Sequence, residues 1–337
     1  MLCRLWLPML AVVLSTGAAR GARFADVTDV SGIRFVHGNG AQGDKHLPET
    51  MGSGLAFIDA DADGQLDLYF VNSVGAAVFY HNKGDGSFAD STAASGLANS
   101  GYGMGVVAAD VDNDGDQDLY ITAYGANLLY RNEGGGRFVD DTQAAGVGDD
   151  GFGSGACLAD YDNDGDTDIF VSDSASPTCT LLRNDGGDEQ HHLTIRAQGT
   201  VSNRDGIGAQ VRVVSGDLIQ TREIRRGYGY MGSNDVRLLV GLGANTQVDT
   251  LQIRWPGGKV QTLVNIAVAV VVKPVTDFVF GSLKWVTDLG HVVHAGGDRM
   301  LANPQTACHL VKVLIDEPVA IVVLAVASLR CSPFELV

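Results

Sequence analysis

A repeat of about 50 residues constrains the fold of this chain more than any other feature. Three Asp-rich runs begin at Asp59, Asp110 and Asp160, and each follows a short Gly-containing stretch. Each full unit offers about four short alternating strands separated by Gly, Asn and Asp turns, which is typical of one propeller blade. The sequence therefore predicts an all-β fold that begins with a partial β-propeller of about three blades.

A second signature recurs between the Asp-rich runs and supports the same period. It has two aromatic or aliphatic residues, then a basic residue and Asn, and it leads into a Gly-rich turn. Its three copies are Phe79-Tyr80-His81-Asn82, Leu129-Tyr130-Arg131-Asn132 and Leu181-Leu182-Arg183-Asn184, of which the third fades after Gly187. The opening residues 24–28 match the end of the same unit, so the chain enters the repeats in mid-phase.

The composition changes after residue 190, where the period stops and longer alternating runs begin. We predict strands in these runs, at His192 to Ala197, Ala209 to Val214, Ile219 to Ile224, Val236 to Leu242 and Val248 to Trp255. The predicted organisation is a signal peptide at 1–22, propeller repeats at 23–190, a small β module at 191–274 and an unassigned tail at 275–337. The tail's apolar stretch from Pro318 to Leu329 is too short to span a bilayer.

The first 22 residues have the pattern of a secretory signal. Arg4 precedes an apolar core from Leu5 to Leu14, and small residues at 17–19 follow it. We therefore expect a secreted or extracellular protein, or a periplasmic or cell-surface one if the source is bacterial. Export would allow cysteines to pair; Cys157 and Cys179 could link adjacent strands, or could remain free thiols.

The net charge points to cations as partners. There are 40 acidic and 23 basic side chains, which give a formal net charge of −17. Such a charge repels nucleic acid and anionic membranes, so Arg222, Arg225 and Arg226 are interpreted as a solvated strand edge. His191 and His192 are interpreted as the start of a strand.

The three acidic runs have the composition of metal-binding loops. Each carries carboxylates at loop positions 1, 3, 5 and 9 and Gly at position 6, and position 7 is expected to contribute its main-chain carbonyl. The predicted ligand residues are Asp59, Asp61, Asp63, Gln65 and Asp67; Asp110, Asp112, Asp114, Asp116 and Asp118; and Asp160, Asp162, Asp164, Asp166 and Asp168. Carboxylates this close repel one another unless a divalent cation lies among them.

Calcium is the cation that these loops favour. An EF-hand is excluded, because position 12 holds Phe70, Ile121 or Val171 instead of Glu and the flanking residues alternate as in strands. Oxygen ligands in a flexible loop favour Ca²⁺ over Zn²⁺, copper or Mg²⁺. We therefore expect about three Ca²⁺ ions.

At the level of families, the repeats resemble the FG-GAP/VCBS repeats of integrin-α-type propellers, and the second module resembles the ASPIC/UnbV domain. The second resemblance rests on four segments, residues 199–209, 227–230, 240–243 and 253–258. The combination is similar to that of cartilage-acidic-protein-like proteins. That resemblance implies extracellular, calcium-dependent binding or adhesion without a catalytic activity.

Two functions from different classes follow from these patterns. The leading one is a secreted calcium-binding propeller that binds a protein or glycan ligand. The alternative is an extracellular propeller hydrolase with an unrecognised site, since fold alone does not decide function. The repeat count raises a further point: three blades leave an open arc with an exposed sheet edge, so we expect the second module or a partner chain to cover it, with self-association through the edge as one possibility.

Overall fold

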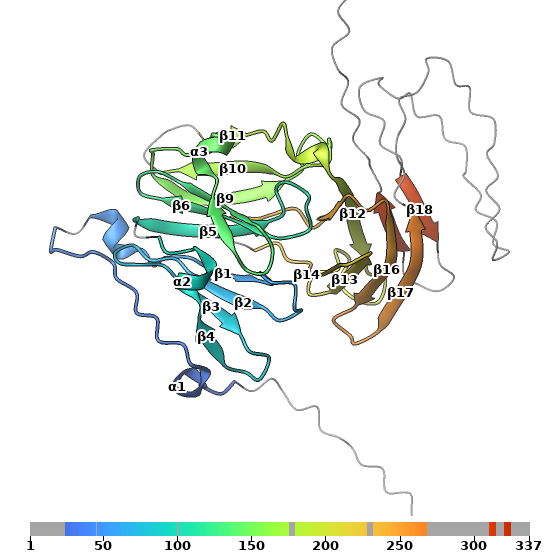
Figure 1. The fold of residues 1–337 in the computed structure, drawn as a ribbon, viewed down its shortest axis with the longest axis horizontal. Coiled ribbons are helices and arrows are strands. Elements are labelled where there is room, and N and C mark those ends of the chain that lie inside the picture. Colours follow the sequence, from blue (N-terminus) through green and yellow to red (C-terminus); the bar gives the residue numbers. More distant parts are fainter. Residues whose placement is uncertain are drawn as a thin grey trace, which may run out of the picture.

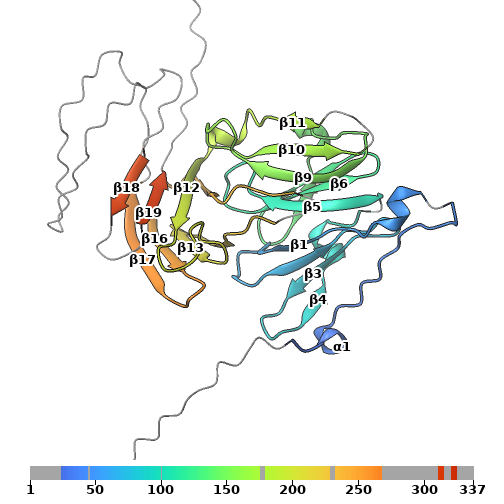
Figure 2. The same ribbon diagram turned by 180° about the vertical axis from the view of Figure 1, so that it is seen from behind.

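The repeats and the second module lie side by side as two groups of sheets. The computed structural model describes residues 24–44, 46–99, 101–174, 179–227, 232–267, 310–314 and 320–324. Figures 1 and 2 show the repeats in blue to green and the second module in yellow to red, with the two groups in contact. The predicted signal peptide, Cys308 and Cys331 lie outside the described residues.

The repeats form three antiparallel sheets in up-and-down order. The first is β1 (Leu55–Ile58), β2 (Asp67–Phe70), β3 (Val78–Asn82) and β4 (Phe88–Asp90). The second is β5 (Gly103–Ala109), β6 (Asp118–Ala123), β7 (Leu128–Asn132) and β8 (Phe138–Asp140). The third is β9 (Gly153–Ala159), β10 (Asp168–Asp173) and β11 (Thr180–Leu182). These are the three predicted blades, and the third has three strands in the described part of the chain, in agreement with its fading sequence signature.

Apolar side chains from neighbouring blades hold the arc together. One core lies between the first and second blades and includes Tyr69, Val106 and Ile121; another lies between the second and third and includes Tyr120 and Val171. Tyr69 and Tyr120 are fully buried and occupy the same position in successive units. Burying a side chain of this size contributes about 1.5 to 3 kcal/mol, so the cores between blades dominate the packing.

Short helical turns connect each unit to the next blade. They are α1 (Thr28–Ser31), α2 (Thr92–Ser95) and α3 (Thr142–Ala145), joined in the first unit by the 3₁₀ turn η1 (Leu47–Thr50). The first two end in left-handed glycines, Gly32 and Gly96, whose missing side chain lets them lie against the carbonyl groups of Phe88 in β4 and Phe138 in β8. These two turns therefore lie against the outer strand of the blade that follows each of them.

The second module is a β-sandwich. One sheet has the order β15 (Leu238–Gly243), β12 (His191–Gln198), β19 (Ala320–Leu324) and β18 (Leu310–Leu314); the 3₁₀ turn η2 (Gly187–Glu189) leads into it. The other has the order β14 (Leu218–Glu223), β13 (Gln210–Ser215), β16 (Gln247–Arg254) and β17 (Val260–Ala267). Both sheets contribute to one core that includes Leu193, Val213, Val240 and Ile253. The five predicted strands are therefore confirmed, and His191 begins a strand as expected. β17, β18 and β19 were not predicted.

The structure also tests the predictions for the cysteines and for Arg222, Arg225 and Arg226. Cys157 and Cys179 are free thiols, the first half-buried in β9 and the second exposed. Arg226 is exposed and pairs with Asp205 at 3.0 Å, as expected of a residue on a solvated edge. The same prediction is wrong for Arg222, which donates to the carbonyl of Gly115 in the second acidic loop at 3.1 Å, and for Arg225, which is partly buried beside Glu223, because both lie in the contact between the two halves. Within the described residues, no helix has the length and apolar character needed to cross a membrane.

Candidate metal centres

The three acidic runs form the same loop at the same place in each blade. They connect β1 to β2, β5 to β6 and β9 to β10, the two strands nearest the inner edge. Gly at position 6 has the expected positive φ in all three, with values of 84°, 106° and 104° for Gly64, Gly115 and Gly165. Position 4 is left-handed as well, with φ near 60° at Ala62, Asn113 and Asn163. This left-handed position was not predicted from the sequence. These two reversals allow alternate side chains to converge.

Position 9 opens the second strand and is fixed by hydrogen bonds. Asp67 accepts hydrogen bonds from the backbone N–H of Ala60 at 3.2 Å and of Asn82 at 2.8 Å. The equivalent bonds recur at Asp118, from Val111 and Asn132, and at Asp168, from Tyr161 and Asn184. All three carboxylates are buried, so the loop closes on an oriented, largely desolvated acid.

Position 1 supplies a buried carboxylate with an unused oxygen. One oxygen of Asp59 accepts the N–H of Gly64 at 3.2 Å, and one of Asp110 accepts the N–H of Gly115 at 3.1 Å. Oδ2 of Asp59, Oδ1 of Asp110 and Oδ1 of Asp160 are buried without a hydrogen-bond donor in the described part of the chain. Such orphaned oxygens cost about 1 to 3 kcal/mol each or more, and a bound cation would satisfy them.

The carboxylates of each loop converge. Ligand oxygens of positions 1, 3 and 9 lie within 4.8 Å of one another in the second loop, at Asp110, Asp112 and Asp118, and in the third, at Asp160, Asp162 and Asp168. In the first loop positions 1, 3 and 5 converge, at Asp59, Asp61 and Asp63, and a second group joins Asp61 and Asp67 to His81. These clusters could hold metal ions, and the three groups made only of aspartates offer the oxygen ligands that suit a hard divalent cation.

Positions 5 and 7 play a more peripheral part. The position-5 carboxylate accepts the N–H of position 7, at 2.7 Å between Asp63 and Gln65 and 2.8 Å between Asp114 and Asp116; Asp164 and Asp166 repeat this bond at 3.4 Å. The position-7 side chains lie beside glycines of the next turn, Gln65 at Gly84, Asp116 at Gly134 and Asp166 at Gly187. That position 7 contributes its main-chain carbonyl to a cation stays a prediction.

Burial raises the pKa of these acids when no cation is present. Desolvation is the main cause and neighbouring carboxylates add to it; the pKa of Asp110 rises to about 8, and those of Asp59, Asp114 and Asp164 to about 6. Burial also raises the pKa of Asp118 well above its ordinary value. A divalent cation would remove the cost of keeping these groups ionised.

Family models match both parts of the chain. A model of the FG-GAP-like repeat matches residues 59–121 and 110–171, and a model of ASPIC and UnbV matches residues 199–273. The chain contains FG-GAP-like repeats and an ASPIC and UnbV domain. No curated protein matches the chain as a whole. Each FG-GAP-like match begins at the first aspartate of an acidic loop, so the matched unit starts at the candidate metal centre.

Asparagines at the end of the third strand tie neighbouring FG-GAP-like repeats together. The amide of Asn132 donates to the carbonyl of Gln117 in its own loop at 3.2 Å and to that of Ala60 in the preceding loop at 2.8 Å. Asn184 repeats both bonds, to Thr167 at 3.3 Å and to Val111 at 2.7 Å. This asparagine is part of the repeat signature, but its bond to the preceding blade was not predicted from the sequence.

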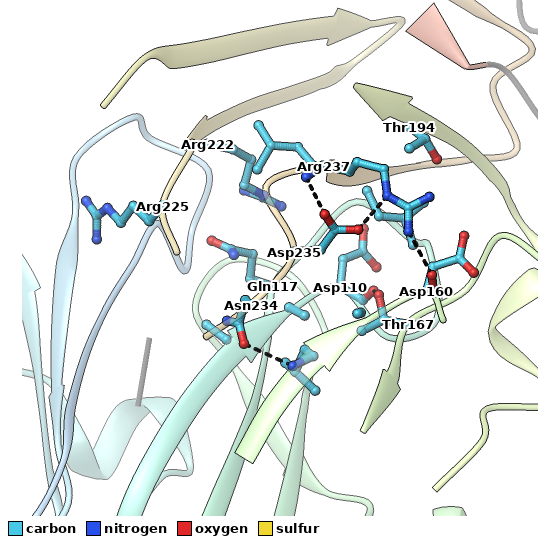
Figure 3. A pocket seen from close by; sticks show the side chains of 16 residues that line it. Asp110, Gln117, Asp160, Thr167, Thr194, Arg222, Arg225, Asn234, Asp235 and Arg237 are labelled. Carbon is cyan, nitrogen blue, oxygen red and sulfur yellow. Dashed lines mark hydrogen bonds and ion pairs between the residues drawn. The ribbon is translucent and has the colours of Figure 1, made fainter. Parts of the chain in front are cut away.

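The ASPIC and UnbV domain covers the second and third loops. The N–H of Gly241 in β15 donates to Oδ2 of Asp110 at 3.1 Å, and the N–H of Gly243 donates to the carbonyl of Asn113 at 3.0 Å. Arg237 donates to the carbonyl of Asp160 at 3.0 Å (Figure 3). It also donates to Oδ1 of Asn163 at 2.8 Å. Two of the three candidate metal centres are therefore part of the contact between the two halves.

The segment between β14 and β15 reaches the inner edge of the arc. Arg225 lies over the ring of Phe57 in β1 at 5.9 Å, and Asn234 accepts the N–H of Leu158 in β9 at 3.1 Å. This connection therefore contacts the first blade at β1 and the third blade at β9. Cover of the open edge by the second module or by a partner chain stays a prediction. Residues 228–231, which include Tyr228 of the family resemblance, lie outside the described residues.

A cavity of about 90 Å³ lies in this contact. Its lining includes Asp110, Asp160, Arg222 and Arg237. Figure 3 shows the side chains of Arg222 and Arg237 directed toward Asp235 and the two loop aspartates, with Arg225 to one side. Because opposite charges face one another across it, the cavity is an electrostatically balanced junction between the two halves.

Proposed function

We propose that this protein is a secreted, calcium-binding β-propeller protein that acts by binding or adhesion to an extracellular protein or glycan, and not by catalysis. The observation that carries the calcium part is the repeated loop geometry. Three loops with the same turn each present converging carboxylates and a buried position-1 oxygen without a donor among the described residues. One such loop could be a simple hairpin turn; three in register favour a common ligand.

Calcium would hold the loops and the two halves together. The chemistry it would supply is charge neutralisation among Asp110, Asp112 and Asp118 and their counterparts in the other loops. The second and third loops also contact the ASPIC and UnbV domain, so their order supports the whole arrangement. The faces and connecting loops would then be free to engage a ligand.

Secretion is supported by the residues at the start of the chain. Arg4 and the apolar run that follows it have the order of a secretory signal, and an exported protein meets calcium at about millimolar concentration. Association through an open sheet edge remains part of this proposal, because the third blade has an exposed outer strand, with Leu181 47% exposed. A pull-down from extracellular fluid with and without a chelator would identify the partner.

Thermal unfolding tests the calcium proposal. Binding to the folded chain alone should stabilise it by about 2.7 kcal/mol per site when calcium exceeds the dissociation constant 100-fold. We expect Tm to rise with calcium and to fall with EDTA. Asp110→Ala and Asp160→Ala should lose part of this response, whereas Gln65→Ala should keep it because its expected contribution is a main-chain carbonyl.

Indifference of Tm to both calcium and EDTA would contradict the proposal. Equal losses in Asp110→Ala and Gln65→Ala would contradict the assigned ligand roles, even if calcium stabilised the protein.

A further inference from the structure

His81 distinguishes the first repeat from the other two. It lies in β3 immediately before Asn82, where the second and third repeats have Arg131 and Arg183. The β2–β3 register pairs Leu68 with Tyr80, so the next residues along, Asp67 and His81, face each other across the two strands. The residue before the signature asparagine therefore lies next to the acidic loop. Of the three repeats, only the first has a histidine at this position.

The imidazole reaches two loop carboxylates. Nδ1 of His81 lies 3.4 Å from Oδ2 of Asp61 and 3.2 Å from Oδ1 of Asp67, which also accepts the N–H of Asn82. The three ligand atoms lie within 4.8 Å of one another. Zinc bonds of about 2.1 Å place neighbouring ligand atoms of a tetrahedral site about 3.4 Å apart, which both measured separations match.

The arginines at this position in the second and third repeats, Arg131 and Arg183, form ion pairs with acidic side chains. Arg131 lies 3.6 Å from Asp112 and is shared with Glu133 and Asp141, while Arg183 pairs with Asp185 at 2.6 Å. A guanidinium stays protonated and has no lone pair to offer a metal. In those repeats the residue can only neutralise carboxylates, whereas a neutral imidazole can add a ligand.

A second observation at the same loop points to a bound cation. Asp59 is 4% exposed, and its Oδ2 is buried without a hydrogen-bond donor in the described part of the chain. Its carboxylate lies within 4.8 Å of that of Asp61, the residue shared with the His81 group. Asp61 therefore belongs to two groups of candidate ligands, one with Asp67 and His81 and one with Asp59 and Asp63.

We propose that the first acidic loop holds a zinc site, with Nδ1 of His81, Oδ2 of Asp61 and Oδ1 of Asp67 as ligands and water in the fourth position. Imidazole nitrogen suits Zn²⁺, whereas Ca²⁺ takes oxygen ligands, so zinc replaces calcium in the first loop, and the calcium proposal then applies to the second and third loops. His81 and Asp61 have side chains 34% and 27% exposed, which gives the ion a path from solvent. This inference uses the proposed function only in treating the acidic loops as cation sites.

Cobalt and zinc titrations of the full chain in excess calcium test the inference. Co²⁺ in a low-coordinate site with a nitrogen ligand gives visible absorption that calcium does not, and Zn²⁺ should displace it at one equivalent. His81→Arg, which introduces the residue of the other repeats, and His81→Gln should weaken zinc binding by at least about 10-fold and abolish the absorption. His46→Gln is a matched control, because the His46 side chain is 71% exposed and only reaches Asp44, at 4.0 Å.

The reciprocal variant transfers the imidazole to another loop. Arg131→His should create a second zinc site at Asp112 and Asp118, with two equivalents of bound Co²⁺. Zinc binding that is equal in the wild type and His81→Arg would overturn the inference, as would wild-type protein that binds no zinc in excess calcium.

These outcomes are separable from those of the calcium proposal. Calcium stabilisation that persists in His81→Arg while zinc binding is unchanged would defeat the zinc site alone. Zinc binding that depends on His81 in a protein whose Tm ignores calcium would defeat the calcium proposal and leave the zinc site standing.

Discussion

At the scale of single residues, the protonation of the loop aspartates links metal binding to pH. Without a cation, burial raises the pKa of Asp110 to about 8 and that of Asp59 to about 6, from 3.8. Between pH 4 and 8 the folded, metal-free chain therefore binds more protons than the unfolded chain, and its stability falls as pH rises. Calcium requires the ionised carboxylates, so its contribution grows over the same range.

We therefore expect the Tm in EDTA to fall from pH 5 to pH 8 and the gap between calcium and EDTA to widen. Differential scanning fluorimetry in both conditions measures this. Asp110→Asn, which imitates the protonated acid, should flatten the EDTA curve, whereas the control Asp85→Asn should leave it unchanged, because Asp85 is an exposed turn residue whose pKa its bonds to Ser87 lower. Parallel calcium and EDTA curves would contradict the expectation.

The residues of the loops were readable from the sequence where the chemistry is local. Aspartates at positions 1, 3, 5 and 9 and glycine at position 6 recur in all three acidic runs. The positive φ of Gly64 follows from its place in the loop. The left-handed Ala62 was not predictable, because alanine has no preference for that conformation and only its alignment with Asn113 and Asn163 places it there. His81 was visible in the repeat signature, but its approach to Asp61 depends on the strand register.

At the scale of elements, the asparagine of the repeat signature makes different contacts in the first and second repeats. Asn132 is fully buried and bonds both its own loop and the carbonyl of Ala60 in the preceding blade. Asn82 holds the carbonyl of Leu66 in its own loop at 2.9 Å, and it is half-exposed. The two side chains therefore share every role except the bond to a neighbouring blade.

Asn132→Ala should lower the free energy of unfolding by about 2 kcal/mol and Asn82→Ala by about 1 kcal/mol, because each buried hydrogen bond is worth about 1 kcal/mol. Urea denaturation in saturating calcium measures both. Equal losses would mean that the link between blades adds nothing beyond the link within the loop.

Strand positions were also predictable from the sequence, since alternating runs such as Val248 to Trp255 coincide with β16 within a residue or two. The third blade has three strands in the part of the chain that the structure describes, and the fading repeat after Gly187 agrees with this. The contact between Arg237 and Asp160 was not predictable, because it joins residues 77 positions apart whose local patterns say nothing of each other.

At the scale of the whole molecule, the second and third acidic loops are part of the contact between the two halves. Asp110 illustrates this, because its two oxygens face different partners: Oδ2 accepts N–H groups from Gly115 in the loop and Gly241 in the ASPIC and UnbV domain, and Oδ1 is left for a cation. Without a cation, burial raises the pKa of this carboxyl at the junction to about 8, so keeping it ionised at pH 7 costs free energy. Calcium binding and docking of the domain should therefore be coupled.

Gly241 is the position at which this coupling can be tested with the smallest change. A Cβ on Gly241 would overlap Oδ2 of Asp110 and the backbone of Asn113, so Gly241→Ala must push β15 away from the second loop. Its φ is not in the left-handed region, and the cost is therefore one of packing between the halves, about 1 to 3 kcal/mol. Gly257→Ala is the control, because nothing lies within 4 Å of a Cβ there.

We expect Gly241→Ala to weaken calcium binding at the second loop and to separate thermal unfolding into two transitions, one for the repeats and one for the ASPIC and UnbV domain. Gly257→Ala should unfold in one transition with the wild-type calcium response. Scanning calorimetry in calcium and in EDTA distinguishes the cases, and EDTA should move the wild type toward the Gly241→Ala profile. A Gly241→Ala protein that unfolds in a single transition with wild-type calcium affinity would show that the halves dock independently of the metal loops.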